Sequence, residues 1–158
     1  MNTTTPDQVL VFTEDIFANL VLDQENPADR FVPIYLGREE ITSVDLDRRF
    51  VLTMARGPEL TGGSSCTEEI GYEGCWRYYT ERTSRSRMVR DVRTIRRTFR
   101  KLAQVSTAGL KPEVAAVQAA LRRTTIDAVE YDYSAVLGLT LVTFAVRQEY
   151  HIDVMAPL

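Results

Sequence analysis

The first apolar pattern along the chain has the period of a helix. Thr5-Pro6-Asp7-Gln8 matches a capping box, with proline at the first helical position and an acidic residue in the first turn. The stripe that follows consists of Val9, Thr13, Ile16 and Leu20, widened by Leu10 and Phe17. Because these positions recur every three or four residues, they predict a helix that begins at Pro6 and fades near Asp23.

A second helical pattern lies in the middle of the chain, over residues 86–104. Its apolar positions recur at spacings of four, three, four and three residues: Met88, Val92, Ile95, Phe99 and Leu102. Ser84 or Ser86 can cap its first turn. Pro112 opens a shorter helix, whose inward-facing residues are Val114, Val117 and Leu121. The two helices together are expected to span residues 86–123.

Alternating apolar and polar positions predict the strands. Residues 31–36 form a short strand in which Pro33 favours a sheet edge or a bulge. Residues 48–56 and 76–81 alternate more clearly, and the chain ends in a hairpin with strands over 124–135 and 138–150. The expected fold class is α+β: a single domain over residues 1–158, with one antiparallel β-sheet flanked by helices.

Residues 57–75 show no clear period and hold five of the eight glycines. They predict a long, mobile, glycine-rich loop that includes a short strand near Ile70. Cys66 and Cys75 fall in this stretch. Two free thiols and a disulfide that closes a small ring both remain open at this point.

The composition suits one globular domain. The chain has 158 residues, of which 44% are hydrophobic, and this is enough to bury a sizeable core. No apolar run approaches the roughly 18 residues that a membrane-spanning helix requires. The N-terminal sequence MNTTTPDQVLVFTEDIF lacks the basic region and the cleavage site of a signal peptide. We therefore expect a soluble protein of the cytosol.

Charge is distributed unevenly along the chain. Residues 1–75 carry 5 basic and 14 acidic side chains, whereas residues 76–123 carry 13 basic and 3 acidic ones. Residues 124–158 carry 1 basic and 5 acidic side chains, which brings the net charge to −3. The segregation predicts surfaces of opposite sign, and such surfaces suit a protein that packs against copies of itself.

The most basic stretch is the helix over 86–104. Its cationic residues Arg90, Arg93, Arg97, Arg100 and Lys101 lie largely away from the apolar stripe. Three interpretations remain open: a solvated face, ion pairing across a subunit interface, and contact with nucleic acid. Residues 86–103 lack the Asn or Gln that often reads bases beside Arg, and the acidic net charge is unfavourable for duplex binding. The five residues are therefore candidates for a subunit interface.

The sequence offers little for catalysis. It has one histidine, His151, near the C-terminus, and two cysteines, which together do not make a zinc site. In the adjacent pairs Glu39-Glu40 and Glu68-Glu69, neighbours in a strand would point to opposite faces. The glycine-rich stretch lacks the Gly-Lys-Ser/Thr ending of a phosphate-binding loop. We expect no enzyme activity, no metal and no cofactor.

In the order and length of its elements the chain resembles the tail terminator and neck proteins of tailed bacteriophages. The resemblance is closest over residues 123–151, RTTIDAVEYDYSAVLGLTLVTFAVRQEYH. In that family the last hairpin begins with an acidic-aromatic strand and ends on a Phe-x-Val step, which here is Phe144-Ala145-Val146. The helix pair over 86–123 is longer than the family pattern, which leaves the exact neck component open.

The resemblance implies a structural role without catalysis or a cofactor. Proteins of this family form a ring, usually of six subunits, that caps the tail tube and joins it to the head connector, with a sheet related to that of the tail tube subunit. It implies a virion protein of the neck or tail, assembled in the host cytoplasm, with no membrane contact and with DNA passing through the lumen. The alternative is a small nucleic-acid-binding or regulatory module that uses the arginine-rich helix.

Overall fold

The computed structural model describes residues 4–23, 25–26, 29–34, 47–61 and 66–152. The chain is α+β, as expected. In order, the elements are α1 (Pro6–Asn19), β1 (Val32–Pro33), β2 (Arg49–Leu60), β3 (Thr67–Tyr79), α2 (Arg85–Arg100), α3 (Pro112–Ala115), the short 3-10 helix η1 (Ala116–Ala120), β4 (Leu121–Ser134) and β5 (Leu139–His151). Within the described ranges, no helix is long and apolar enough to span a membrane.

The strands form one sheet in the order β1-β2-β3-β5-β4. The expectation of an antiparallel sheet is wrong at one edge, because β1 runs parallel to β2 and makes the sheet mixed. The Val32 amide donates to the Arg48 carbonyl at 3.3 Å and the Ile34 amide to the Phe50 carbonyl at 2.7 Å. Pro33 lies between these two donors, where its missing N–H costs no sheet hydrogen bond. The edge position predicted from Pro33 is therefore confirmed.

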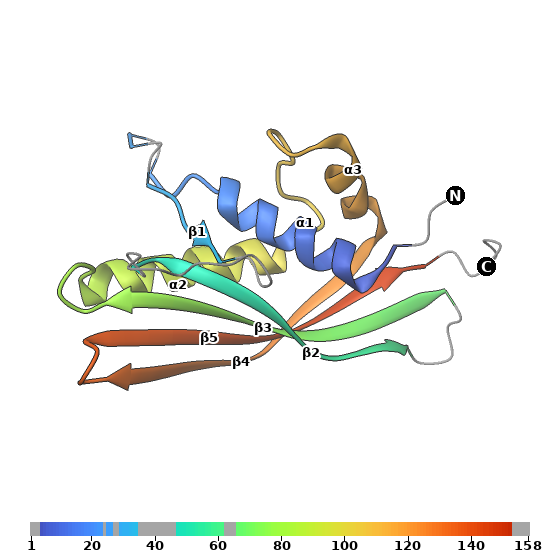
Figure 1. Ribbon diagram of the computed structural model, residues 1–158. Coiled ribbons are helices and arrows are strands. Elements are labelled where there is room, and N and C mark those ends of the chain that lie inside the picture. Colours follow the sequence, from blue (N-terminus) through green and yellow to red (C-terminus); the bar gives the residue numbers. More distant parts are fainter. Residues whose placement is uncertain (1–3, 24, 27–28, 35–46, 62–65, 153–158) are drawn as a thin grey trace.

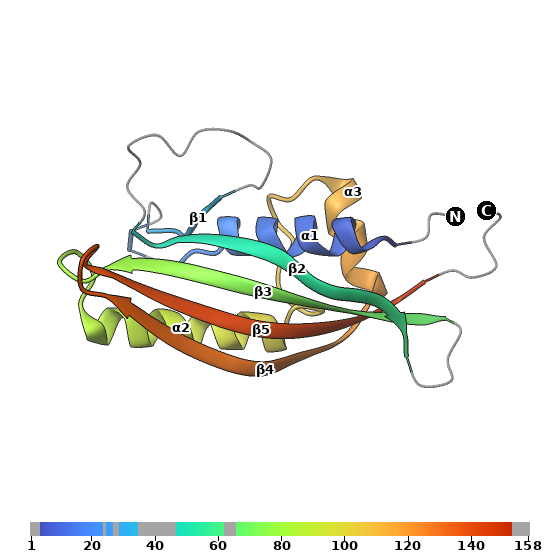
Figure 2. The same ribbon diagram turned by 60° about the horizontal axis from the view of Figure 1, so that its bottom comes forward.

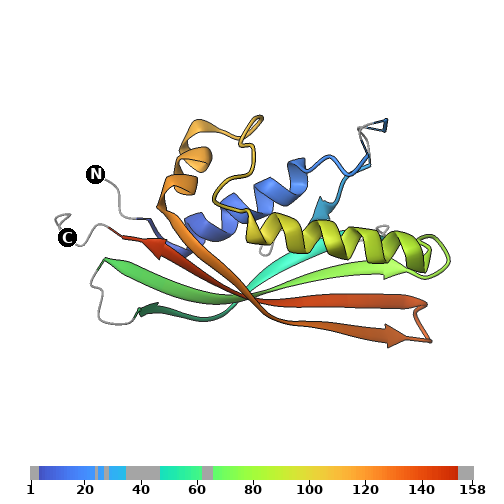
Figure 3. The same ribbon diagram turned by 180° about the vertical axis from the view of Figure 1, so that it is seen from behind.

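All the helices lie on the same face of the sheet (Figures 1 and 3). Figure 2 shows the opposite face, which no helix of the described ranges covers. The core between the helices and the sheet is rich in aromatic side chains. Trp76 of β3 stacks on Phe50 of β2, with ring centroids 5.1 Å apart, and meets Phe17 of α1 edge-on at 5.0 Å. Phe17 also contacts Phe99 of α2 at 4.8 Å, so both helices pack against one cluster.

Local sequence explains where the two longer helices begin. The capping box of α1 is confirmed, since the Thr5 hydroxyl accepts from the Gln8 amide at 3.3 Å and the Gln8 side chain accepts from the Thr5 amide at 3.0 Å. α1 ends at Asn19, earlier than predicted. Ser84 caps α2, with its hydroxyl accepting from the Arg87 amide at 3.3 Å. α2 ends at Arg100, four residues before the predicted end. Both helices bury most of the apolar stripes that their sequences predict, while Leu20 and Met88 are only half-buried.

The prediction of a loop over residues 57–75 is wrong for most of its length. β2 continues to Leu60 and β3 begins at Thr67, while residues 62–65 lie outside the described part of the chain. The alternation of apolar and polar residues is not visible in the sequence, because glycine occupies strand positions where a neighbouring side chain fills the space of a Cβ. A Cβ at Gly74 would lie 2.7 Å from the Trp76 ring, and one at Gly71 would lie 2.8 Å from the Arg56 side chain. The mobility of this stretch in solution stays a prediction.

The described structure also corrects the region after Pro112. The expected helix is short and gives way to η1, and β4 already begins at Leu121, which pairs with Tyr150. Val117 and Leu121 are buried as predicted, but Leu121 is buried from a strand. Cys66 and Cys75 are both free thiols. They are nine residues apart along one extended stretch, about 30 Å, which is too far for a disulfide between them.

Candidate functional site: the cationic face of helix α2

Helix α2 divides into a buried side and a cationic side. Val92, Ile95 and Phe99 are buried against the sheet together with Asp91 and Thr98. The five residues predicted as interface candidates, Arg90, Arg93, Arg97, Arg100 and Lys101, are all exposed. At 3.6 residues per turn they fall on the arc opposite the buried stripe. The predicted separation of stripe and arginines is therefore confirmed, whereas their role in an interface stays a prediction.

Arg90 has different surroundings from the other four. It lines a hollow of about 290 Å³ together with Asp23, Asp29 and Asp91. Its charge therefore faces carboxylates of its own chain. Arg93, Arg97, Arg100 and Lys101 form the remaining, exposed part of the arc.

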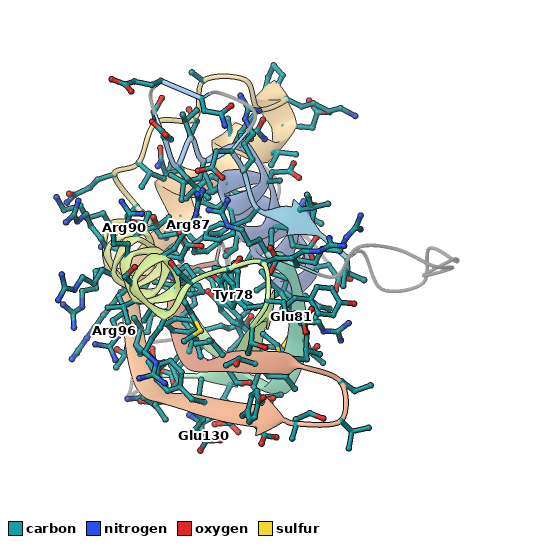
Figure 4. The ribbon with its side chains drawn as sticks, turned by 90° about the vertical axis from the view of Figure 1, so that its left-hand side faces the viewer. Tyr78, Glu81, Arg87, Arg90, Arg96 and Glu130 are labelled. Atoms are coloured by element: carbon teal, nitrogen blue, oxygen red, sulfur yellow. The ribbon has the colours of Figure 1, made fainter. Side chains whose placement is uncertain are left out.

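Arg96 belongs with these residues, although the sequence analysis did not single it out. It is exposed, and Figure 4 shows it on the side of α2 nearer to β4, with Arg90 on the side away from β4. Its spacing of three residues from Arg93 and four from Arg100 was the signal that could have found it. We call Arg93, Arg96, Arg97, Arg100 and Lys101 the cationic face.

The cationic face is unfavourable for the stability of the isolated helix. Like charges stand four residues apart in the pairs Arg93–Arg97, Arg96–Arg100 and Arg97–Lys101. Each such pair destabilises a helix by about 0.2–0.5 kcal/mol. No side chain of the cationic face forms a hydrogen bond or ion pair within the described part of the chain. The fold therefore does not account for this concentration of charge.

A buried ionic network fixes the position of α2. Asp91, on the inner side of the helix, accepts from Arg48 Nε at 3.1 Å and from the Tyr78 hydroxyl at 3.1 Å. Asp29 pairs with both Arg48 and Arg87. The side chains of Asp29, Arg48 and Asp91 are only 7–12% exposed. The network joins α2 to β3, to the start of β2 and to the segment before β1, and so holds the cationic face rigidly.

Burial and ion pairing have opposite effects on the pKa values of the charged groups in this network. Burial raises the pKa of the Asp91 carboxyl above its ordinary value, although hydrogen bonds from Arg48 and Tyr78 act in the opposite direction. Burial lowers the pKa of the Arg48 guanidinium, but its hydrogen bonds to Asp91 and Asp29 outweigh this effect and raise it. Burial, together with the nearby Asp91, raises the pKa of Tyr78 as well. The cation of Arg48 is therefore the fixed charge around which the carboxylates are arranged.

Sequence reasoning did not find this network. Arg48 is 19 residues from Asp29 and 43 from Asp91, so no local spacing relates the three. Arg48 also adopts a left-handed backbone conformation with φ 59°, which is uncommon for a residue other than glycine. One signal was present, since Asp91 is the only acidic residue between Arg82 and Lys101. A lone carboxylate in a basic helix indicates a buried cation nearby.

The other residues considered for chemistry are scattered. His151 is exposed at the end of β5. Glu68 accepts from the Tyr150 hydroxyl at 2.8 Å, whereas Glu69 lies near Arg56 and Arg147, so the pair points to opposite faces as predicted. Glu39 and Glu40 lie outside the described residues. Within the residues that the structure describes, no three His, Cys, Asp or Glu side chains are grouped to hold a metal.

No model of a known protein family matches the chain, and no curated protein matches its sequence.

Proposed function

We propose that this protein is a structural subunit of the neck of a tailed bacteriophage. As a tail terminator or neck ring protein, it caps the tail tube and joins it to the head connector. The observation that carries the proposal is the cationic face of α2, which is exposed, rigidly anchored and without partners in the described part of its own chain. In this proposal the face joins neighbouring subunits of a ring.

The layout of the fold supports the proposal. Residues 123–151, which carry the resemblance to the phage proteins, form most of the hairpin of β4 and β5. Phe144 and Val146 of the Phe-x-Val step are buried beneath the helices. A sheet with helices on one face only, as in Figure 2, leaves a broad second surface for packing in a ring.

Energetics favour a repeated contact over a single one. Because α2 is anchored, its arginines can pair with a partner without ordering of the backbone, although each side chain still loses rotamer entropy. An exposed ion pair contributes only about 0–1 kcal/mol, so one pair would not decide assembly. A ring presents the same set of pairs at every interface. The acidic first half of the neighbouring subunit supplies carboxylates for them, among them the exposed Asp7, Glu25, Glu59 and Glu73.

The experiment reverses the charge of the face. The variant R93E/R97E/R100E should stay folded by circular dichroism and should no longer form rings in native mass spectrometry and negative-stain images. Arg90 is left unchanged, because a glutamate there would meet Asp29 and Asp91 in their shared hollow. The control K111E/R122E/R123E changes the net charge equally at exposed residues outside α2 and should assemble normally.

Two results would contradict this role. Wild-type protein that stays monomeric, alone and with tail tube or connector proteins, contradicts the ring. Intact rings from R93E/R97E/R100E contradict the interface.

The second candidate function, contact with nucleic acid, shares the same observation. Arginines on one rigid helix can contact successive phosphates, either as a DNA-binding module or as the lining of a channel through which DNA passes. In that case R93E/R97E/R100E would assemble normally and would lose DNA binding or retention. Affinity of the wild type for DNA would also fall steeply with salt.

A further inference from the structure

Strand β4 leaves one edge of the sheet open. It is the last strand in the sheet order, and no described strand pairs with its outer side. Its first half is irregular, with register shifts between Leu121 and Thr124 and between Ile126 and Ala128. From Ala128 to Ser134 it pairs with β5 in unbroken register. Along this regular stretch the outward N–H and C=O groups can pair with another strand.

The regular stretch has only part of the usual protection of an edge. Natural edge strands are commonly protected by proline, charged side chains, bulges or a covering segment. Here Glu130 and Asp132 supply charge, and the register shifts lie outside the stretch. Residues 128–134, AVEYDYS, contain neither proline nor lysine. They also expose two large aromatic side chains, since Tyr131 is 53% and Tyr133 59% exposed. Its unpaired backbone groups and its two exposed tyrosines are therefore accessible to another strand.

A groove accompanies the open edge. It has a volume of about 570 Å³ and lies between β4 and the first turns of α2. Tyr78 and Thr140 are buried at its floor, and the exposed Tyr131 and Tyr133 form a wall. Arg85 of α2 also lines it. Figure 4 views this end of the molecule, with Tyr78 beneath α2 and Arg96 on the side of the helix toward β4.

The two sides of the edge carry opposite charge. Tyr131 and Tyr133 pair with Val142 and Thr140, which are buried, so they share the side that faces α2 with Arg85 and Arg96. Glu130 and Asp132 alternate with them and are exposed, and Figure 4 shows Glu130 on the side of β4 away from α2. A strand added here would place alternate residues beside arginines and the others beside carboxylates.

This charge pattern disfavours a second copy of the same edge. If two β4 strands paired, Glu130 and Asp132 of both copies would lie along the same face. Like charges on neighbouring strands are destabilising. The pattern favours a segment with basic side chains on one side and apolar or acidic side chains on the other.

We propose that residues 128–134 bind an extended segment of another protein, which adds to the sheet as a strand beside β4. Backbone hydrogen bonds to the open edge supply affinity, and the groove and the two charged sides supply specificity. Apolar and acidic side chains of the segment face the tyrosines, Arg85 and Arg96. Lysines or arginines of the segment face Glu130 and Asp132. The site shares Arg96 with the cationic face, but residues 128–134 lie outside that face, so the proposal does not depend on the contact between ring subunits.

The test uses a short fluorescein-labelled peptide that alternates lysine with valine, leucine and glutamate. It should bind wild-type protein saturably in fluorescence anisotropy and protect residues 128–134 from hydrogen exchange. The same peptide, N-methylated at the alternate residues whose N–H groups would face β4, cannot donate hydrogen bonds to that strand and should bind about tenfold more weakly or worse. Equal binding of the two peptides, or no saturable binding of the first, overturns the proposal.

A protein variant tests the recognition of charge. E130K/D132K should bind the lysine peptide about tenfold more weakly and should prefer a peptide with glutamate in place of lysine. E59K/E113K makes the same change of charge at exposed residues away from β4 and should behave as wild type. An unchanged preference in E130K/D132K overturns the proposal. Self-association of the protein also overturns the proposal if E130K/D132K abolishes it and the peptide does not compete with it. In that case the edge binds a second copy of this chain.

Discussion

Helices α1 and α2 pack against the core in the same way but differ on their exposed sides. Each buries an apolar stripe on the same face of the sheet, and Phe17 and Phe99 meet in one aromatic cluster. The outer side of α1 is mixed, with the exposed Asp7, Gln8 and Val11. The outer side of α2 is almost entirely cationic and lacks partners in the described chain.

The difference separates structure from function. Packing on the sheet requires only the stripe, as α1 shows. The cationic face of α2 adds unfavourable like-charge pairs, and a separate buried network around Asp91 holds it in place. The cationic face lowers the stability of α2 and contributes nothing to the packing of the core. It is therefore the part of the molecule most suited to binding a partner.

The largest expected effects test the similarity of the two helices. Phe17→Ala and Phe99→Ala should each lower the free energy of unfolding by about 3–5 kcal/mol, because both rings are fully buried beside Trp76. Urea denaturation followed by the fluorescence of Trp76, the only tryptophan, measures both. The exposed Val11→Ala should cost less than about 0.5 kcal/mol. A loss below about 1 kcal/mol in either phenylalanine variant would mean that its helix packs differently.

An intermediate effect should belong to α2 alone. Asp91→Ala leaves Arg48 with only Asp29 in a buried site and should cost about 3 kcal/mol in the same denaturation measurement. Asp91→Asn keeps hydrogen-bonding capacity and should cost less. Asp7→Ala removes an exposed carboxylate from the first turn of α1 and should cost about 0.5 kcal/mol. Equal costs at Asp91 and Asp7 would show that the network does not anchor α2.

The smallest effect should be a gain. Arg93→Gln removes like-charge contacts with Arg90, Arg96 and Arg97, which stand three or four residues away, and should stabilise the monomer by about 0.5 kcal/mol. Thermal unfolding at low ionic strength measures the gain, which should shrink as salt is added. Arg122→Gln, an exposed change in β4, is the control and should be neutral. A destabilised Arg93→Gln monomer would show that Arg93 has a stabilising role within its own chain.

The sequence by itself determined the two main helices, their caps and the separation of arginines from the apolar stripe in α2. These features depend on residues at most four positions apart, so local spacing is enough to predict them. The terminal hairpin was predictable for a similar reason, because the clear alternation over Leu139–His151 and a short turn determine it. Most of the strand structure within residues 57–75 was not predicted from the sequence. Gly71 and Gly74 interrupt the alternation of apolar and polar residues there, because the side chains of Arg56 and Trp76 occupy the space that a Cβ would need.

Only the tertiary structure decided how these parts meet. The network of Asp29, Arg48 and Asp91 joins residues that are far apart along the chain, and no local pattern encodes their contact. The open edge of β4 depends on the order β3-β5-β4, in which the last hairpin adds to the sheet through β5 and leaves β4 outermost. Which arginine faces Asp29 and which faces solvent depends on the rotation of α2 against the sheet. That rotation results from packing between distant side chains, and its free energy belongs to the whole core rather than to the helix.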